Sequence, residues 1–151
     1  MTTRHAWLLV AFLGVALFLN NCDRHTVFSL FPVLRSELHF TDTQLGLTGS
    51  IFLWVYALCN PISGQIGDRY SKRKLVTWSL FLWSGVTALT GFSTSPGMLL
   101  ACRGMLGVTE SLFMPSAMAL LASVHGPRTR SSAANVFGIG EYAGVAVGGW
   151  F

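Results

Sequence analysis

Apolar residues occur in long runs along the chain, and short polar segments separate them. Between Thr43 and Gly67 there is no Asp, Glu, Lys or Arg, and this stretch exceeds the ~20 residues that an α-helix needs to cross a bilayer. Four further stretches have a similar character, although the first contains a polar patch. The pattern predicts an all-α integral membrane protein whose spans cover about residues 6–34, 45–66, 75–92, 98–124 and 131–151.

The first span allows two interpretations because its apolar run stops at Asn20–His25 and resumes at Val27–Leu34. One interpretation is a short span over Ala6–Leu19 followed by a loop. We favour one long helix with a polar patch in its outer half, because Val27, Phe28 and the apolar residues after them are unusual in a loop.

Capping residues and prolines indicate where helices begin and bend. The segment Thr41–Gln44 has the composition of a capping box at the start of the second span. Pro96 and Pro127 are well placed at or just before helix starts. Pro61 and Pro115 fall inside predicted spans, where a missing N–H and a steric clash kink a helix.

Close helix packing is predicted in the last span and throughout the bundle. Gly140, Gly144 and Gly148 follow one another at four-residue steps, so a neighbouring helix can approach their backbone closely. The connections between spans are short, which favours antiparallel neighbours in one bundle.

Composition excludes a soluble domain. Hydrophobic residues make up 52% of the chain and charged residues 11%, against about 25% charged in a typical soluble domain. Lys and Arg outnumber Asp and Glu by 10 to 6, but no basic stripe alternates with aromatic residues, so no nucleic-acid partner is expected. Cys22, Cys59 and Cys102 have neither metal-site nor disulfide spacing. We therefore expect no metal and no cofactor, and membrane lipids as the surroundings.

The basic residues also predict the orientation. The segment Gly67–Lys74 carries four of them and His125–Arg130 carries two, whereas the alternate connections carry Arg35 and none. The positive-inside rule then places the N-terminus and both basic loops in the cytoplasm. The first apolar run lacks a small-residue cleavage site, which favours an uncleaved span. The expected location is the cell membrane, crossed several times.

Five charged residues lie inside predicted spans, where each costs about 2.5–3.5 kcal/mol near the bilayer centre; they are Asp23, Arg24, Arg103, Glu110 and Glu141. Such residues should face the bundle interior or a watery cavity, and Asn60 before Pro61 is a further candidate for the cavity wall. Asp23, Arg24 and Arg103 can meet at similar depth. Glu110 follows Arg103 by two helical turns on the same face. It is a candidate proton carrier, although the charges could also only neutralise one another and hold helices together.

Two motifs resemble those of the major facilitator superfamily. The segment Gly64–Lys74 (GQIGDRYSKRK) is similar to the signature between helices two and three, with Ser71 in place of the usual Gly. Arg103, Gly107 and Glu110 resemble the fourth-helix motif. The resemblance covers essentially the whole chain and implies an N-terminal helical bundle of that fold. It also implies alternating access, with Gly64, Asp68, Arg69 and Arg73 in a cytoplasmic latch.

Two branches of the superfamily compete. Arg24, Tyr56 and the Asp23 and Glu110 carboxylates resemble proton-coupled anion:cation symporters, in which Asp23 and Glu110 would carry protons and Arg24 and Tyr56 would contact substrate. The runs 41–47, 67–73 and 82–90 look as much like the Spinster-like branch, linked to lipids and amphiphiles. Glu141 departs from the first branch. Val145 stands where the drug-antiporter signature needs Pro, which counts against drug efflux.

Three function classes follow, and a transporter is the best supported. An integral membrane enzyme would need paired catalytic groups near an interface, and no cluster has that spacing. A non-transporting scaffold or remnant would leave the membrane charges unexplained. The resemblance implies a second half of the bundle that this chain lacks, so we expect a fragment of a longer protein. The expected partners are that C-terminal half, a small organic anion or amphiphile as substrate, and protons.

Overall fold

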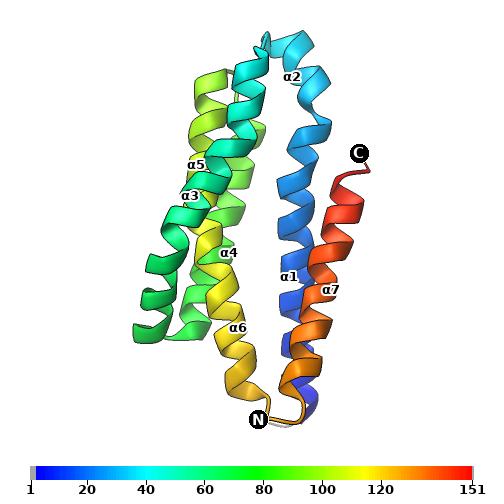
Figure 1. Ribbon diagram of the computed structural model, residues 1–151, viewed down its shortest axis with the longest axis vertical. Coiled ribbons are helices and arrows are strands. Elements are labelled where there is room, and N and C mark those ends of the chain that lie inside the picture. The colour runs from blue at the N-terminus through cyan, green and yellow to red at the C-terminus, as the bar shows by residue number, and fades with distance from the viewer. Residues whose placement is uncertain (1–2, 151) are drawn as a thin grey trace. The chain divides into compact units, whose positions relative to one another are not determined.

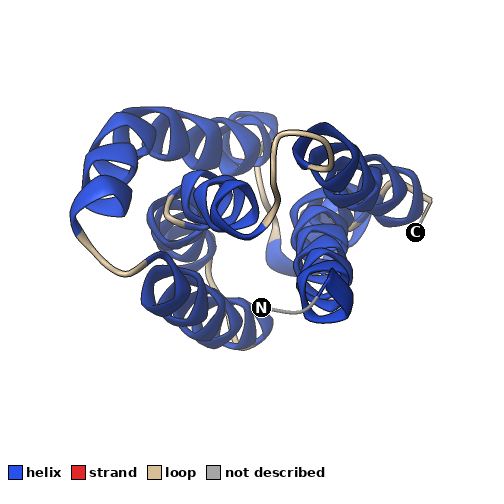
Figure 2. Ribbon diagram, turned by 90° about the horizontal axis from the view of Figure 1, so that it is seen from below, coloured by secondary structure: helices blue, strands red, loops and turns tan. Residues whose placement is uncertain are grey.

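All regular structure in the described part of the chain is helical. The structure is a computed structural model that describes residues 3–150, and Figure 2 shows helices and connecting loops only within this range. The elements are α1 (Thr3–Ser29), α2 (Phe31–Leu38), α3 (Asp42–Arg69), α4 (Lys72–Gly91), α5 (Pro96–Ser111), α6 (Phe113–Val124) and α7 (Arg130–Gly148). The predicted all-α class is confirmed.

The first span ends earlier than we predicted. The polar patch lies within α1, which argues against a short span ending at Leu19, but α1 stops at Ser29 instead of reaching Leu34. A separate short helix, α2, follows from Phe31. Pro32 explains the break, because it has no N–H to donate and its ring clashes with the carbonyl group four residues earlier.

Prolines also shape the fourth predicted span. It consists of α5 and α6, which are interrupted at Leu112. Pro115 cannot donate to the carbonyl group of Ser111, so the helix breaks one turn before it, as expected for a kink. The other internal proline, Pro61, lies within α3, which continues through it to Arg69.

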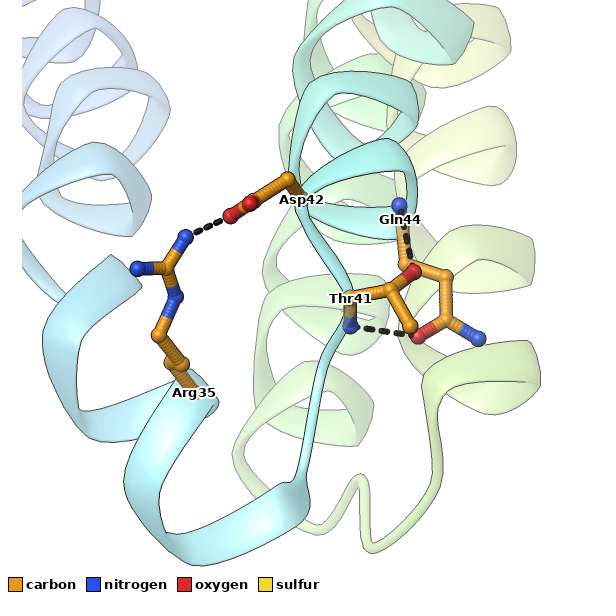
Figure 3. A network of polar contacts seen from close by, with 4 residues as sticks. All are labelled: Arg35, Thr41, Asp42 and Gln44. Carbon is orange, nitrogen blue, oxygen red and sulfur yellow. Dashed lines mark hydrogen bonds and ion pairs between the residues drawn. The ribbon is translucent and has the colours of Figure 1, made fainter.

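The predicted helix starts at Thr41 and Pro96 are confirmed. Figure 3 shows the capping box of α3, in which the Gln44 N–H donates to Thr41 Oγ1 over 3.3 Å and the Thr41 N–H donates to Gln44 Oε1 over 2.9 Å. Arg35 of α2 forms an ion pair with Asp42 in the first turn of α3. Pro96 is the first residue of α5, and Ser95 Oγ caps that helix by accepting from the Met98 N–H.

Among the described residues, three helical stretches are long and apolar enough to cross a membrane: Arg4–Ser29, Asp42–Arg69 and Pro96–Val124. The helices α4 and α7 have 20 and 19 residues but do not meet this criterion. The helix α4 begins with three basic residues, Lys72, Arg73 and Lys74. Their crossing of the membrane stays a prediction.

The chain divides into two compact units. The first comprises Met1–Ser29 with Ala117–Phe151 and therefore holds α1, α7 and most of α6. The second comprises Leu30–Ser116. In the first unit α1 and α7 lie side by side (Figure 1). A Cβ atom at Gly144 would lie 2.5 Å from the Phe18 carbonyl oxygen, and one at Gly148 would lie 2.7 Å from that of Cys22. The glycines at four-residue steps therefore lie at a close helix approach, as predicted, and the neighbouring helix is α1.

In the second unit α5 packs against both α3 and α4 (Figure 1). One shared core comprises Phe52, Trp83, Val86, Cys102 and Leu106, with Tyr56 and Leu80 against it. A second cluster, built on Phe40, Leu45 and Leu99, joins apolar residues of α2 to the starts of α3 and α5. The helix α5 is thus the central element of this unit, and it carries two of the predicted membrane charges.

Candidate functional site

Arg103 and Glu110 are both buried on α5. Their residues are 4% and 3% exposed, although Arg and Glu are almost never fully buried in proteins unless paired. A separation of seven residues places the two side chains on the same face of the helix. The prediction that these charges avoid the outer surface of the bundle is confirmed for this pair.

The helices α5 and α3 approach each other closely at Gly107, which lies between Arg103 and Glu110 in the sequence. A Cβ atom at Gly107 would lie 2.9 Å from the carbonyl oxygen of Phe52 and 3.1 Å from the backbone nitrogen of Tyr56. Only a glycine fits there without displacement of a helix. Tyr56 is half-buried at this level, and its ring stacks on Phe52 with centroids 5.8 Å apart. The helix contact therefore brings the backbone at Tyr56 to the level between Arg103 and Glu110.

Buried hydroxyl groups join the helices on either side of Glu110 in the sequence. The hydroxyl oxygens of Ser63 in α3 and Ser111 in α5 lie 2.8 Å apart and share a hydrogen bond. Ser79 of α4 donates to the carbonyl oxygen of Thr109 over 2.8 Å. Sequence reasoning missed these contacts, and the signal that could have found them is the presence of Ser and Thr within apolar helices.

The first unit contains the polar patch of α1. Asp23 and Arg24 are half-buried, and an Arg24 guanidinium N–H donates to Asn20 Oδ1 over 3.4 Å. Asn20 and Asn21 are each 4% exposed, and Asn21 Nδ2 donates to the carbonyl oxygen of Leu17 over 3.0 Å. We did not predict the two asparagines as site residues, although they interrupt the apolar run and mark the patch.

The remaining predicted site residues are divided between the two units. Glu141 is half-buried on α7 in the first unit, with Asp23 and Arg24 on α1. Asn60, with Arg103 and Glu110, belongs to the second unit, and its side chain is exposed on α3. The meeting of Asp23 and Arg24 with Arg103, and the place of Asn60 in a cavity wall, stay predictions.

The predicted latch loop is mostly helical. Gly64, Asp68 and Arg69 lie in the last turns of α3, and Arg73 lies in the first turn of α4. Only Tyr70 and Ser71 connect the helices; the Tyr70 N–H donates to the Ile66 carbonyl oxygen over 3.0 Å. Asp68, Arg69 and Arg73 are exposed. The motif is therefore a tight helix–helix corner with charged side chains on its surface.

The described residues contain no group of three or more His, Cys, Asp or Glu side chains arranged to hold a metal ion.

Long apolar helices with charges buried at helix contacts define a multi-pass membrane protein of the helical-bundle class.

Comparison with known proteins identifies the family. The model of the Major Facilitator Superfamily matches residues 13–151. The chain belongs to the major facilitator superfamily, as its two motifs indicated.

Two relatives are equally similar to this chain in sequence identity. Protein spinster homolog 1 of Homo sapiens is 32% identical over 152 residues, and probable anion transporter 4, chloroplastic, of Arabidopsis thaliana is 32% identical over 142 residues; each alignment covers 93% of this chain. The chain spans only 28% and 27% of their lengths. Relatives of this family are transporters, so the prediction that the chain is not an enzyme is confirmed.

A solved structure supports the fold. It is a bacterial homologue of the human lysosomal transporter Spinster in an inward-facing and unoccupied conformation, with a TM-score of 0.91 and 22% sequence identity. The match covers 98% of this chain and 31% of that one. The chain thus shares the fold of part of that structure.

Substitution of Gly107 tests the close approach of α5 to α3. We expect Gly107→Ala to lower the free energy of unfolding by about 1–3 kcal/mol, because the new methyl group overpacks the contact between α5 and α3. Gly104→Ala on the same helix is the matched control, since a Cβ atom there meets nothing within 4 Å. Unfolding in mixed detergent micelles measures both. Equal stability of the two variants would contradict the close approach.

Proposed function

We propose that the chain is the N-terminal part of a secondary active transporter that works by alternating access. The observation that carries the proposal is the burial of Arg103 and Glu110 on one face of α5. Charges held inside a membrane bundle generally mark substrate or proton pathways. Membership of a transporter superfamily supports the same interpretation. In this proposal a C-terminal half outside this chain completes the site.

Proton coupling is the second step of the proposal, with Glu110 and Asp23 as proton carriers. A carboxylate inside the membrane can gain and lose a proton where a cation lies near enough to stabilise its charged form. Arg103 is two turns from Glu110, and Arg24 is next to Asp23 in the sequence. Each proposed carrier therefore has an arginine on its own helix.

The proposed substrate is a small organic anion or an anionic amphiphile. Arg24 and Arg103 would bind its negative group, since a guanidinium presents a planar set of donors to a carboxylate or phosphate. Tyr56, Asn60 and Glu141 would complete the wall of the cavity. The probable anion transporter among the relatives supports the first class, and the resemblance to the Spinster-like branch supports the second.

The proposed orientation has the N-terminus in the cytoplasm of a cell whose plasma membrane holds the protein. The four basic residues from Arg69 to Lys74 support it, because positive charge collects on the cytoplasmic side. Asp68 would then act as a cytoplasmic latch by accepting hydrogen bonds from a helix N-terminus of the other half. Arg73 would brace it by charge.

Neutralisation of Glu110 tests the proton-carrier role. In proteoliposomes containing the full-length protein, we expect Glu110→Gln to abolish substrate uptake driven by a proton gradient while substrate exchange without a gradient persists. The reason is that the amide cannot release a proton. Glu37→Gln is the control, because Glu37 is exposed on α2. Full gradient-driven uptake by Glu110→Gln would exclude the role.

Replacement of Asp68 tests the latch separately. Asp68→Asn should reduce the transport rate at normal expression, since the amide keeps the shape of the side chain but loses the charge that attracts a helix N-terminus. Asp68→Glu should retain more activity than Asp68→Asn. The transport rate per molecule of purified protein measures both variants. An unchanged rate for Asp68→Asn would leave the basic segment as a topology signal only.

A further inference from the structure

We propose that the pocket between α6 and α7 binds an anionic phospholipid. The pocket belongs to the first unit and has a volume of about 150 Å³. Its walls are apolar except for one cation; they are formed by Met118, Ala119, Leu121, Ala122, Arg130 and Ala134. Because the volume admits only part of a lipid, the occupant would insert a segment of an acyl chain and leave its remainder in the bilayer.

The charge around this pocket favours an anionic headgroup. Arg128 and Arg130 are both exposed, and within the described residues neither side chain has an ion pair. The chain contains no Asp or Glu between Glu110 and Glu141, so no carboxylate of this segment competes for them. The guanidinium group of Arg130, which lines the pocket, presents the donors that a phosphate needs.

A second pocket provides the contrast. It lies between α2 and α3, has a volume of about 520 Å³ and is also mostly apolar, with Arg35 in its wall. There the ion pair with Asp42 already neutralises the cation (Figure 3). The two pockets thus share an apolar wall and one arginine, and they differ in whether the arginine has a carboxylate partner.

An aromatic contact places the pocket near the membrane surface. Trp7 of α1 packs edge-on against His125 with ring centroids 5.1 Å apart, and His125 directly follows the end of α6. Tryptophan is enriched where the apolar bilayer meets the headgroups. Arg128 and Arg130 follow within five residues, so in this proposal their cations would lie at the level of the lipid phosphates. In the proposed orientation this end of the helices is cytoplasmic, and basic pockets between membrane helices on that side commonly bind such headgroups.

The experiment measures lipid binding to the full-length protein in detergent by native mass spectrometry. The probes are phosphatidylglycerol, phosphatidylcholine of the same chain length, and water-soluble glycerol phosphate. We expect phosphatidylglycerol to bind more tightly than phosphatidylcholine. Arg130→Gln should weaken phosphatidylglycerol binding by about fivefold, and Arg130→Lys should restore part of it. Ala134→Leu should also weaken it, because the larger side chain fills the pocket without changing the charge.

Arg35→Gln is the matched control, and it should leave phosphatidylglycerol binding unchanged. Equal binding of the two phospholipids would overturn the proposal, and so would equal binding of glycerol phosphate and phosphatidylglycerol. Wild-type binding by both Arg130→Gln and Ala134→Leu would also overturn it, as would an equal loss in Arg35→Gln. None of these outcomes depends on transport, so the proposal and the transport function fail or stand separately.

Discussion

The cost of keeping charge away from water is the constraint on which the rest of this structure depends. An isolated ion in a bilayer is expensive, yet Arg103 and Glu110 are buried on α5. The helix can hold them only because neighbouring helices shield it from lipid. Gly107 allows α3 to approach the backbone of α5 between the two charges, and α4 contacts α5 as well. Arg103 and Glu110 can therefore act inside the membrane only while the helices of the second unit stay packed around them.

Small residues and hydroxyl groups provide this packing in place of a hydrophobic driving force, which is weak between helices in lipid. Ser63 and Ser111 join α3 to α5, and Ser79 joins α4 to α5. In the first unit, the glycines of α7 allow the same close approach to α1. In both units small or hydroxyl side chains thus allow the helices to pack closely. Each unit also retains polar side chains that the apolar surroundings would otherwise exclude.

Much of the fold could be predicted from the sequence, because bilayer thickness fixes helix length and because Thr41 and Pro96 fix helix starts. The end of α1 was missed because the apolar run continues beyond Ser29, although Pro32 is a signal in the sequence for a helix end. For the site, the burial of Glu110 was predictable from its place in an apolar run. The hydrogen bond from Arg24 to Asn20 and the pairing of Ser63 with Ser111 were not, because they depend on side-chain contacts within a helix and between helices rather than on sequence spacing.

The proton-carrier role proposed for Glu110 requires that position 110 reaches water during transport, which cysteine accessibility can measure. In the full-length protein with Cys22, Cys59 and Cys102 replaced, a cysteine is placed at position 110 and exposed to a membrane-impermeant thiol reagent from each side of the membrane. We expect labelling from both sides, whereas a cysteine replacing Leu58, which is 70% exposed on α3 and would face apolar surroundings, stays unlabelled. No labelling of position 110 from either side would exclude the proton-carrier role of Glu110.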